Sequence, residues 1–217
     1  MEKGYIGKLY HMCEWVMRIA YLNILWLAFT LAGFVLFGLF PSTIAMYTVT
    51  RKWVQGNTDI KLFHLFWHTY RKELFKSQKI GLVLMAALLL FVLDYKFYMN
   101  QTSTALVYAK IIWFACVVLF GTFNLYFFPV YVHYQCKPLQ YIKNVFLIAV
   151  MFPLHSFLLW CGALFILLFI YNFQGLSLFF SGSVLAFWIT LVTHNVFSKI
   201  NVKGAVQEGR SLTIGTQ

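Results

Sequence analysis

Acidic side chains are scarce in this sequence: Asp and Glu together number six, against 17 Lys and Arg. Charged residues of either sign make up only 11% of the 217 residues, whereas hydrophobic residues make up 61% and the mean hydropathy is +0.75. A soluble domain has about a quarter of its residues charged, so that class is excluded. The composition indicates a polytopic membrane protein.

The sequence also lacks the short motifs of the common enzyme classes. It contains no G-x-S-x-G, no H-E-x-x-H, no Walker loop and no glycine-rich dinucleotide turn. These motifs place a nucleophile, a catalytic metal or a bound phosphate in a known geometry. We therefore expect a protein that is not an enzyme and that carries no cofactor.

Cysteine and histidine are too scattered to predict a disulfide framework or a metal site. No two cysteines have the C-x-x-C spacing. His64 and His68 stand four residues apart, but no acid follows His64 and no third ligand is near, whereas a zinc centre needs three or four. The four cysteines are Cys13, Cys116, Cys136 and Cys161.

Five apolar runs are long enough to cross a bilayer, which takes about 20 residues. We expect the spans at 19–40, 80–98, 105–128, within 142–171 and at 176–197. The predicted fold class is all-α, a polytopic membrane helix bundle of about five transmembrane helices plus interfacial amphipathic helices. The whole chain, 1–217, is expected to form a single integral membrane domain.

Three prolines are expected to interrupt helices, because proline lacks a backbone N–H and its ring clashes with the preceding turn. Pro41 is predicted to end the first span, with a short helix, 44–54, after it. Pro129 is predicted to end the third span. Pro153 falls inside an apolar run of thirty residues, which fits either a kinked helix or an interfacial segment to about Val150 followed by the span proper.

The stretch 41–79, between the first two spans, carries seven Lys and Arg but only two acids. Such a block cannot cross a bilayer, and it is predicted to be cytoplasmic. Gly56 is expected to end its first helix, and Asp59 to cap the second. Arg51 and Lys52 lie at the carbonyl end of the first helix, where cations meet the helix dipole favourably and can reach lipid phosphate.

The second helix of this stretch repeats aromatic residues at steps of three and four, with Lys, Arg and His on its other face. This pattern fits a helix lying in the membrane interface with its aromatic side down. It equally fits a helix that packs its aromatic side on the rest of the protein. The aromatic residues for which we predict contact with a partner or with lipid are Phe63, Phe66, Trp67, Tyr70 and Phe75.

Lys and Arg are divided unevenly between the two sides of the predicted topology. Twelve lie in the stretch 41–79, in the connection after the third span and in the tail, and five lie on the other side. This predicts a cytoplasmic C-terminus. Five spans then place the N-terminus outside, against its own three basic residues, and a sixth crossing through the helix after Pro41 would remove the conflict. The tail, 198–217, has no apolar period and is expected to be loosely ordered.

The formal net charge of +11 raises the question of nucleic-acid binding. The basic residues cluster between apolar runs, however, where anionic lipid headgroups are the expected counter-charge. We therefore expect membrane lipids as partners and no nucleic acid.

Polar residues at membrane depth are few. His155 and Asn195, with His194, are the clearest examples, and such residues are functional candidates by default. No acid lies in the middle of a predicted span, so there is no carboxylate relay, and we expect His155 to pack or to form a hydrogen bond.

Several short motifs occur in order over the first eighty residues. They are Asn23-x-Leu25-Trp26, Pro41-Ser42-Thr43, Ala45, Val49, Arg51-Lys52, Gly56, Phe66-Trp67, Tyr70, Phe75 and Lys76-Ser77. In these motifs the sequence resembles the YesL family, bacterial integral membrane proteins that contain a domain of unknown function. The resemblance implies a multi-pass protein of the bacterial cell membrane. It also implies an accessory role beside a carbohydrate importer of the ABC class, taking up oligosaccharides.

Two functions follow from these observations. In the first, the protein is a non-enzymatic partner subunit that docks through the segment from Arg51 to Lys79 on an ABC transporter complex, on a second copy of itself or on lipid. In the second, it is a small transporter or channel that acts as an oligomer. Its pore would use Asn23, Asn124, His155 and Asn195.

Overall fold

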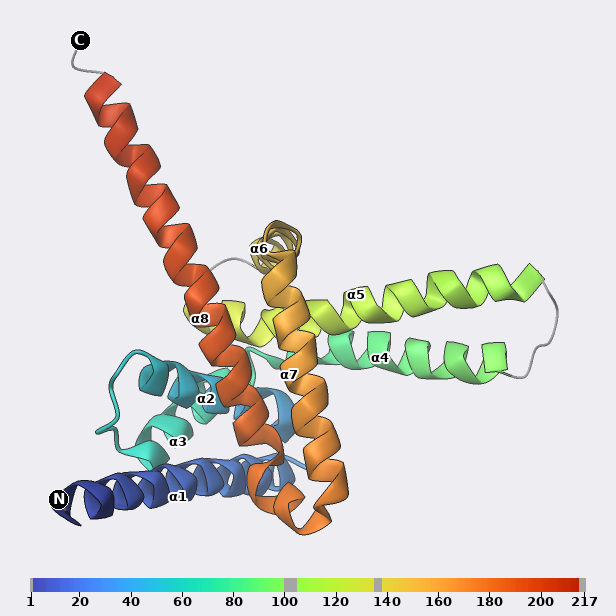
Figure 1. Ribbon diagram of the computed structural model, residues 1–217. Coiled ribbons are helices and arrows are strands. Elements are labelled where there is room, and N and C mark those ends of the chain that lie inside the picture. The colour runs from blue at the N-terminus through green and yellow to red at the C-terminus, as the bar shows by residue number, and fades with distance from the viewer. Residues whose placement is uncertain (1, 100–104, 135–137, 215–217) are drawn as a thin grey trace.

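The computed structural model describes residues 2–99, 105–134 and 138–214, and this part of the chain contains eight helices and no strand (Figure 1). The predicted all-α class is confirmed. The helices are α1 (Glu2–Ala32), α2 (Leu36–Val54), α3 (Leu62–Glu73), α4 (Gln78–Met99), α5 (Ala105–His133), α6 (Pro138–Met151), α7 (Pro153–Asn172) and α8 (Gln174–Ile214).

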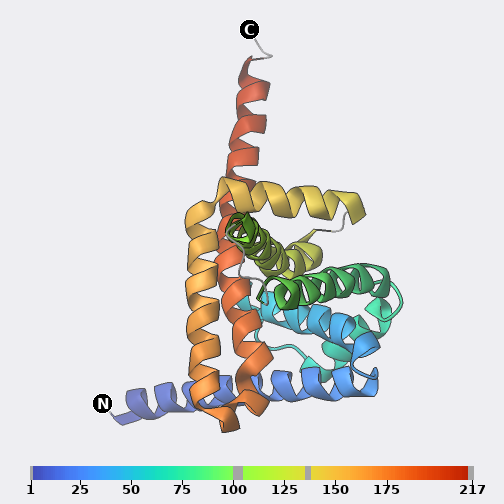
Figure 2. The same cartoon turned by 90° about the vertical axis from the view of Figure 1, so that its right-hand side faces the viewer.

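Five helices hold segments that are long and apolar enough to cross a membrane, as the sequence predicts. Large apolar side chains are exposed along them, which suits helices surrounded by lipid tails. Figures 1 and 2 show α7 and α8 running side by side, whereas α1 and the α4–α5 hairpin run across them, so the apolar helices follow more than one direction. The segments are Gly7–Ala32, Gln78–Tyr95, Lys110–His133, Pro153–Asn172 and Gly175–Lys199.

The first two helices form a hairpin. The chain turns at 33–35, where Phe34 and Val35 have φ angles of 52° and 62°. A Cβ atom on Gly33 would lie 2.4 Å from the Cα atom of Gly38, so the hairpin closes only because both residues lack side chains. The predicted break at Pro41 is therefore wrong, since the chain turns earlier.

Pro41 lies inside α2, and a neighbouring side chain explains why the helix continues. Proline has no N–H to offer the carbonyl oxygen of Phe37, four residues earlier. Gln78, at the start of α4, supplies that donor, with its Nε2 atom 2.5 Å from the oxygen. The hydrogen bond that Pro41 removes is thus replaced from another helix.

α2 lies at the centre of the molecule, packed against α1, α3, α5 and α8. Its polar residues Ser42 and Thr50 are buried, and the hydroxyl oxygen of Thr50 lies 3.0 Å from that of Thr190 in α8. This enclosure explains why α2 is less apolar than the five candidate spans, because little of it faces lipid. Around it the core collects Ile44, Val49 and Trp53 of α2, Phe66 of α3, Tyr126 of α5 and Ile189 of α8.

At the open end of the α1–α2 hairpin, the N-terminal half of α1 contacts the basic stretch 41–79. Nη1 of Arg18 donates a hydrogen bond of 2.9 Å to the carbonyl oxygen of Thr58, and the ring centroids of Trp15 and Trp53 are 5.5 Å apart. These contacts place the N-terminal segment and the stretch after α2 at the same end of the hairpin. A crossing by α2 would bring these two segments to one side of a membrane, and α2 itself is not among the five candidate spans.

Gly56 ends α2 as predicted. Its φ angle is 87°, and the N–H groups of Gly56 and Asn57 donate to the carbonyl oxygens of Trp53 and Lys52 in the Schellman pattern. The predicted cap at Asp59 is wrong. Lys61 holds the N-cap position of α3 and makes no side-chain cap, because Ile60 packs on the core and the segment before α3 is extended.

The helices α4 and α5 form an antiparallel hairpin that extends away from the rest of the chain (Figure 1). Phe91 pairs with Phe120 and Tyr95 with Trp113, with ring centroids 5.1 and 5.8 Å apart. α5 continues through Pro129 to His133, so the predicted end at Pro129 is wrong. Pro129 faces the packed junction of α2, α5 and α8. Packing at this junction holds the last turn of α5 in place after the proline.

Of the two arrangements expected around Pro153, one kinked helix or a separate segment followed by the span, the structure has the second. α6 ends at Met151, and Pro153 opens α7, where its missing N–H costs no hydrogen bond. α8 continues to Ile214, so residues 198–214 of the tail are helical. No proline follows Gln174, and extending an existing helix costs less than starting one.

Candidate functional site

Arg51 lies in the last turn of α2 and reaches the end of α5. Its Nη1 atom donates a hydrogen bond of 2.8 Å to the carbonyl oxygen of Val132. Because α5 ends at His133, this carbonyl is among the four at a helix end that have no donor within the helix. Burial lowers the pKa of the Arg51 guanidinium, since desolvation disfavours its charge, and the helix dipole of α5 offsets part of that cost. Arg51 therefore joins α2 to α5.

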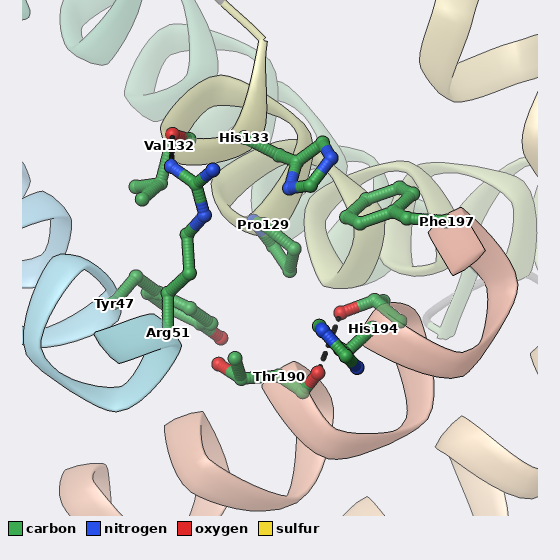
Figure 3. Close-up of a pocket in the computed structure, with 9 residues that line it drawn as sticks. Tyr47, Arg51, Pro129, Val132, His133, Thr190, His194 and Phe197 are labelled. Atoms are coloured by element: carbon green, nitrogen blue, oxygen red, sulfur yellow. Dashed lines mark hydrogen bonds between the residues drawn. The ribbon is translucent and has the colours of Figure 1, made fainter. Parts of the chain in front are cut away.

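On the side that faces α8, Arg51 borders a tightly packed junction, whose side chains are drawn in Figure 3. Side chains from α2, α5 and α8 surround a space of about 10 Å³, which is room for one water molecule at most. The His133 ring stacks on Phe197 with centroids 4.4 Å apart. The residues around this space are Tyr47, Arg51, Pro129, Val132, His133, Thr190, Thr193, His194 and Phe197.

The outer side of Arg51 lines a larger pocket of about 260 Å³ between α2, α3 and α5, which we call the α2–α3–α5 pocket. Three cations line it, Arg51, Lys72 and Lys76, and Lys72 and Lys76 are exposed. Opposite them stands a single carboxylate, Glu73. The other lining residues are Ile44, Thr48, His68, Thr69, Tyr131 and Val132.

Glu73 is a site residue that the sequence interpretation missed. Its side chain is only 7% exposed, and its Oε2 atom accepts a hydrogen bond of 2.7 Å from the Tyr131 hydroxyl, which ties α3 to α5. Its Oε1 atom lies 4.0 Å from Nζ of Lys76. The signal was present, because Glu73 follows Phe66 and Tyr70 at steps of four and three and so shares their buried face.

The aromatic residues of α3 do not form one exposed stripe. Phe66 is 0% exposed and Tyr70 is 7% exposed, so the prediction that these two contact a partner or lipid is corrected. Both belong to the buried core, where the ring of Phe29 in α1 packs on them, with its centroid 5.3 Å from that of Phe66 and 5.0 Å from that of Tyr70. The Tyr70 hydroxyl also donates to the carbonyl oxygen of Phe29. Of the two alternatives, these residues follow the one in which α3 packs on the protein.

Three aromatic residues of α3 and the turn after it remain exposed, and we call them the outer aromatics: Phe63, Trp67 and Phe75. They are 53%, 43% and 85% exposed. Exposed basic side chains accompany them along the segment: His64, His68, Arg71, Lys72 and Lys76.

Lys52 faces a different cavity from Arg51. This cavity holds about 390 Å³ and lies between the end of α2, the loop before α3 and α3 itself, where Lys61, His64 and His68 also line it. In the described part of the chain, no three His, Cys, Asp or Glu come together as a metal site would require. Cys13, Cys116 and Cys161 are free, and Cys136 lies outside the described residues.

The motifs of the first span and of Pro41-Ser42-Thr43 meet each other in the α1–α2 hairpin. Nε1 of Trp26 donates a hydrogen bond of 3.1 Å to the Thr43 hydroxyl, and the hydroxyl oxygens of Thr30 and Ser42 are 2.7 Å apart. Together with the close approach of Gly33 and Gly38, these contacts hold the two helices of the hairpin together. The motif residues Trp26, Pro41, Ser42, Thr43 and Gly56 thus shape the hairpin and its ends.

Asn23, the first residue of the motif in α1, is fully buried against α8. Its Nδ2 atom donates to the carbonyl oxygen of Leu178 at 2.8 Å, and its Oδ1 atom accepts from the backbone N–H groups of Gly182 and Ser183 at 2.9 and 3.0 Å. Asn23 fixes α1 to α8.

The other polar residues at membrane depth do not gather around Asn23. Nδ2 of Asn124 donates to the carbonyl oxygen of Phe120 in its own helix, and Asn195 is exposed on α8. His155 forms a contact of 3.4 Å through Nε2 with Nζ of Lys199. Each of the four residues expected in a pore is thus placed in a different local environment.

Comparisons with known proteins bear on this architecture. A family model described as a protein of unknown function, DUF624, matches residues 19–95, which include the C-terminal part of α1, all of α2 and α3 and most of α4. Three proteins of Bacillus subtilis (strain 168), each described as uncharacterized, align with most of the chain. YesL is 37% identical over 191 residues (88% of this chain, 90% of YesL), YesV 40% over 196 (87% and 92%), and YteU 30% over 216 (96% and 93%). No solved structure matches the chain.

Proposed function

The chain belongs to the YesL family of DUF624 proteins, and from that premise we propose that it is a non-enzymatic partner subunit of another membrane protein complex. The family resemblance points to an importer of the ABC class that takes up oligosaccharides as the partner. The docking segment is α3 with the residues that follow it, up to Lys79.

The outer aromatics are the observation that carries this proposal. Exposed apolar residues on α4, α5 and α7 belong to candidate spans, where lipid tails account for them. Phe63, Trp67 and Phe75 belong to a short segment outside those spans and stand among basic residues. Aromatic side chains and arginine are enriched at protein interfaces, and the same segment adds the exposed Arg71 to the three aromatics.

The surface is also held in place before any partner arrives. Phe66 and Tyr70 pack on Phe29, and Glu73 accepts the hydrogen bond from Tyr131. A docking surface fixed by the core loses little conformational freedom on binding, which favours affinity.

Photo-crosslinking in the native membrane tests the proposal. A photoreactive amino acid at Phe75, which is 85% exposed, should crosslink to a permease subunit of an importer, identified by mass spectrometry. The matched control is Phe114, 64% exposed on α5, which should not give that product because lipid tails surround it. A product of twice the mass of the chain at Phe75 would instead identify a second copy as the partner.

A substitution experiment gives the complementary result. Replacing Phe63 and Trp67 together by alanine should leave the protein folded in the membrane but remove the importer from the purified complex. Replacing Phe114 and Phe165, which are similarly exposed on candidate spans, should leave the complex intact. If the wild-type chain purifies alone in gentle detergent, the partner proposal is wrong, and sugar or ion flux in proteoliposomes becomes the next measurement.

A further inference from the structure

We propose that the α2–α3–α5 pocket binds a phosphate group, carried either by a membrane phospholipid headgroup or by a small soluble compound. The proposal stands independently of the partner function, because the outer aromatics do not line this pocket.

Charge is the first argument. Arg51, Lys72 and Lys76 line the pocket against one carboxylate, Glu73. That carboxylate is already engaged by the Tyr131 hydroxyl on one oxygen and lies 4.0 Å from Lys76 on the other. The pocket therefore keeps an excess of positive charge, which an anion would neutralise.

Hydrogen-bonding capacity is the second argument. The bond from Arg51 to Val132 uses one of the five N–H donors of the guanidinium, so the group can serve a second acceptor. Its fork of donors matches the geometry of a phosphate, and the two lysines add mobile point charges at the rim.

Position is the third argument. The pocket lies at the open end of the α4–α5 hairpin, because Lys76 comes two residues before the span that begins at Gln78, and Tyr131 comes two residues before the end of the span at His133. The ends of spans lie at the level of the lipid headgroups. A phosphate of the neighbouring leaflet would therefore lie beside these cations.

Size is the fourth argument. About 260 Å³ falls below the roughly 300 to 1,000 Å³ of pockets that enclose a drug-sized molecule. The space suits a headgroup or a phosphorylated small molecule, and it is too small for an oligosaccharide. The side chains of Ile44 and Val132 give the pocket an apolar wall against which a glycerol backbone can rest.

The test uses the full-length chain in a neutral detergent at an ionic strength of about 0.15 M, where long-range surface attraction is screened. Binding of three probes is measured by calorimetry: short-chain phosphatidylglycerol, glycerol phosphate and inorganic phosphate. We expect saturable binding of at least one of them. Binding of only the short-chain lipid identifies a headgroup site, and binding of glycerol phosphate or phosphate at similar affinity identifies a soluble ligand.

Two pairs of substitutions distinguish binding in the pocket from attraction by the general surface charge. Replacing Lys72 and Lys76 by glutamine should weaken binding about tenfold or more, because two of the three cations that line the pocket are lost. The control replaces Arg71 and Lys79, which are exposed in the same segment, carry the same charge and lie outside the pocket. This control should change the affinity less than twofold. Equal weakening by both pairs, or no saturable binding of any probe to the wild-type chain, would overturn the proposal.

Discussion

Oδ1 of Asn23 in α1 accepts a hydrogen bond of 2.9 Å from the backbone N–H of Gly182 in α8, 159 positions further along the chain. The same side-chain amide donates to the carbonyl oxygen of Leu178, four residues before Gly182. In a regular α-helix these two backbone groups pair with each other. The Asn23 amide therefore engages both groups of one helical hydrogen bond of α8, and asparagine suits this place because one planar group offers both a donor and an acceptor.

Replacing Asn23 by leucine should lower the free energy of unfolding by about 1–3 kcal/mol, because the hydrogen bonds of its amide to α8 are lost. The measurement is chemical unfolding in detergent micelles. Asn124 is the matched control, since its amide bonds only to its own helix, and Asn124→Leu should change the same quantity by about 0.5 kcal/mol or less. Similar losses for both variants would mean that the contact between α1 and α8 contributes nothing specific.

A double-mutant cycle tests the replacement of the hydrogen bond that Pro41 removes. Gln78→Ala should cost about 0.5–1.5 kcal/mol in the natural background, because the carbonyl oxygen of Phe37 then has no donor. In a Pro41→Ala background residue 41 supplies its own N–H, so the cost of losing the Gln78 side chain should fall towards zero. Equal costs in the two backgrounds would show that Gln78 does not compensate for Pro41.

Arg51 and Lys52 allow a comparison between adjacent cations. Arg51→Glu should reduce the amount of folded, monodisperse protein extracted from the membrane well below that of Lys52→Glu, because Arg51 holds the end of α5 and Lys52 is exposed. Arg51→Lys should fall between them, since lysine keeps the charge but not the planar fork. Fluorescence-detected gel filtration measures the yields, and equal yields for the two Glu variants would reduce Arg51 to a surface charge.

Cysteine labelling in intact cells tests the topology, starting from a chain without its four native cysteines. Cysteines near Gly56 and Gly209 should be shielded from an impermeant thiol reagent, and one at Gln174 should be labelled. The contacts of Arg18 and Trp15 with the end of α2 add that a cysteine at Lys8 should be shielded as well. Labelling at Lys8 together with shielding at Gly56 would restore the arrangement with five crossings.

Features set by local composition could be predicted from the sequence. The number of apolar spans follows from run length, the end of α2 from Gly56, and the break before α7 from Pro153. Each of these depends on residues close together in the chain, so periodicity and turn chemistry suffice to find them.

Features that depend on a distant partner could not be predicted. Pro41 reads as a helix end because the donor that compensates for it, Gln78, is 37 positions away and belongs to another helix. Phe66 and Phe63 look alike in the sequence and both contact Phe29 of α1, and only the packing of α3 on the core decides that the first is enclosed and the second exposed. Glu73 is a different case, because its spacing from Phe66 and Tyr70 marks it as buried, whereas its partner Tyr131 on α5 could not be found from the sequence.

The closed α1–α2 hairpin has a consequence for how the chain enters the membrane during synthesis. Between Arg18 and Arg51 the sequence contains no charged residue, and the structure folds this interval back on itself at 33–35. A hairpin inserted as one unit carries only the uncharged turn across the bilayer and leaves both charged ends where they were made. In that orientation fifteen Lys and Arg stay on the side of synthesis and two, Lys96 and Lys110, are translocated. In such an insertion, the close approach of Gly33 and Gly38 would let the chain turn within the bilayer without translocating the basic residues at either end of the hairpin.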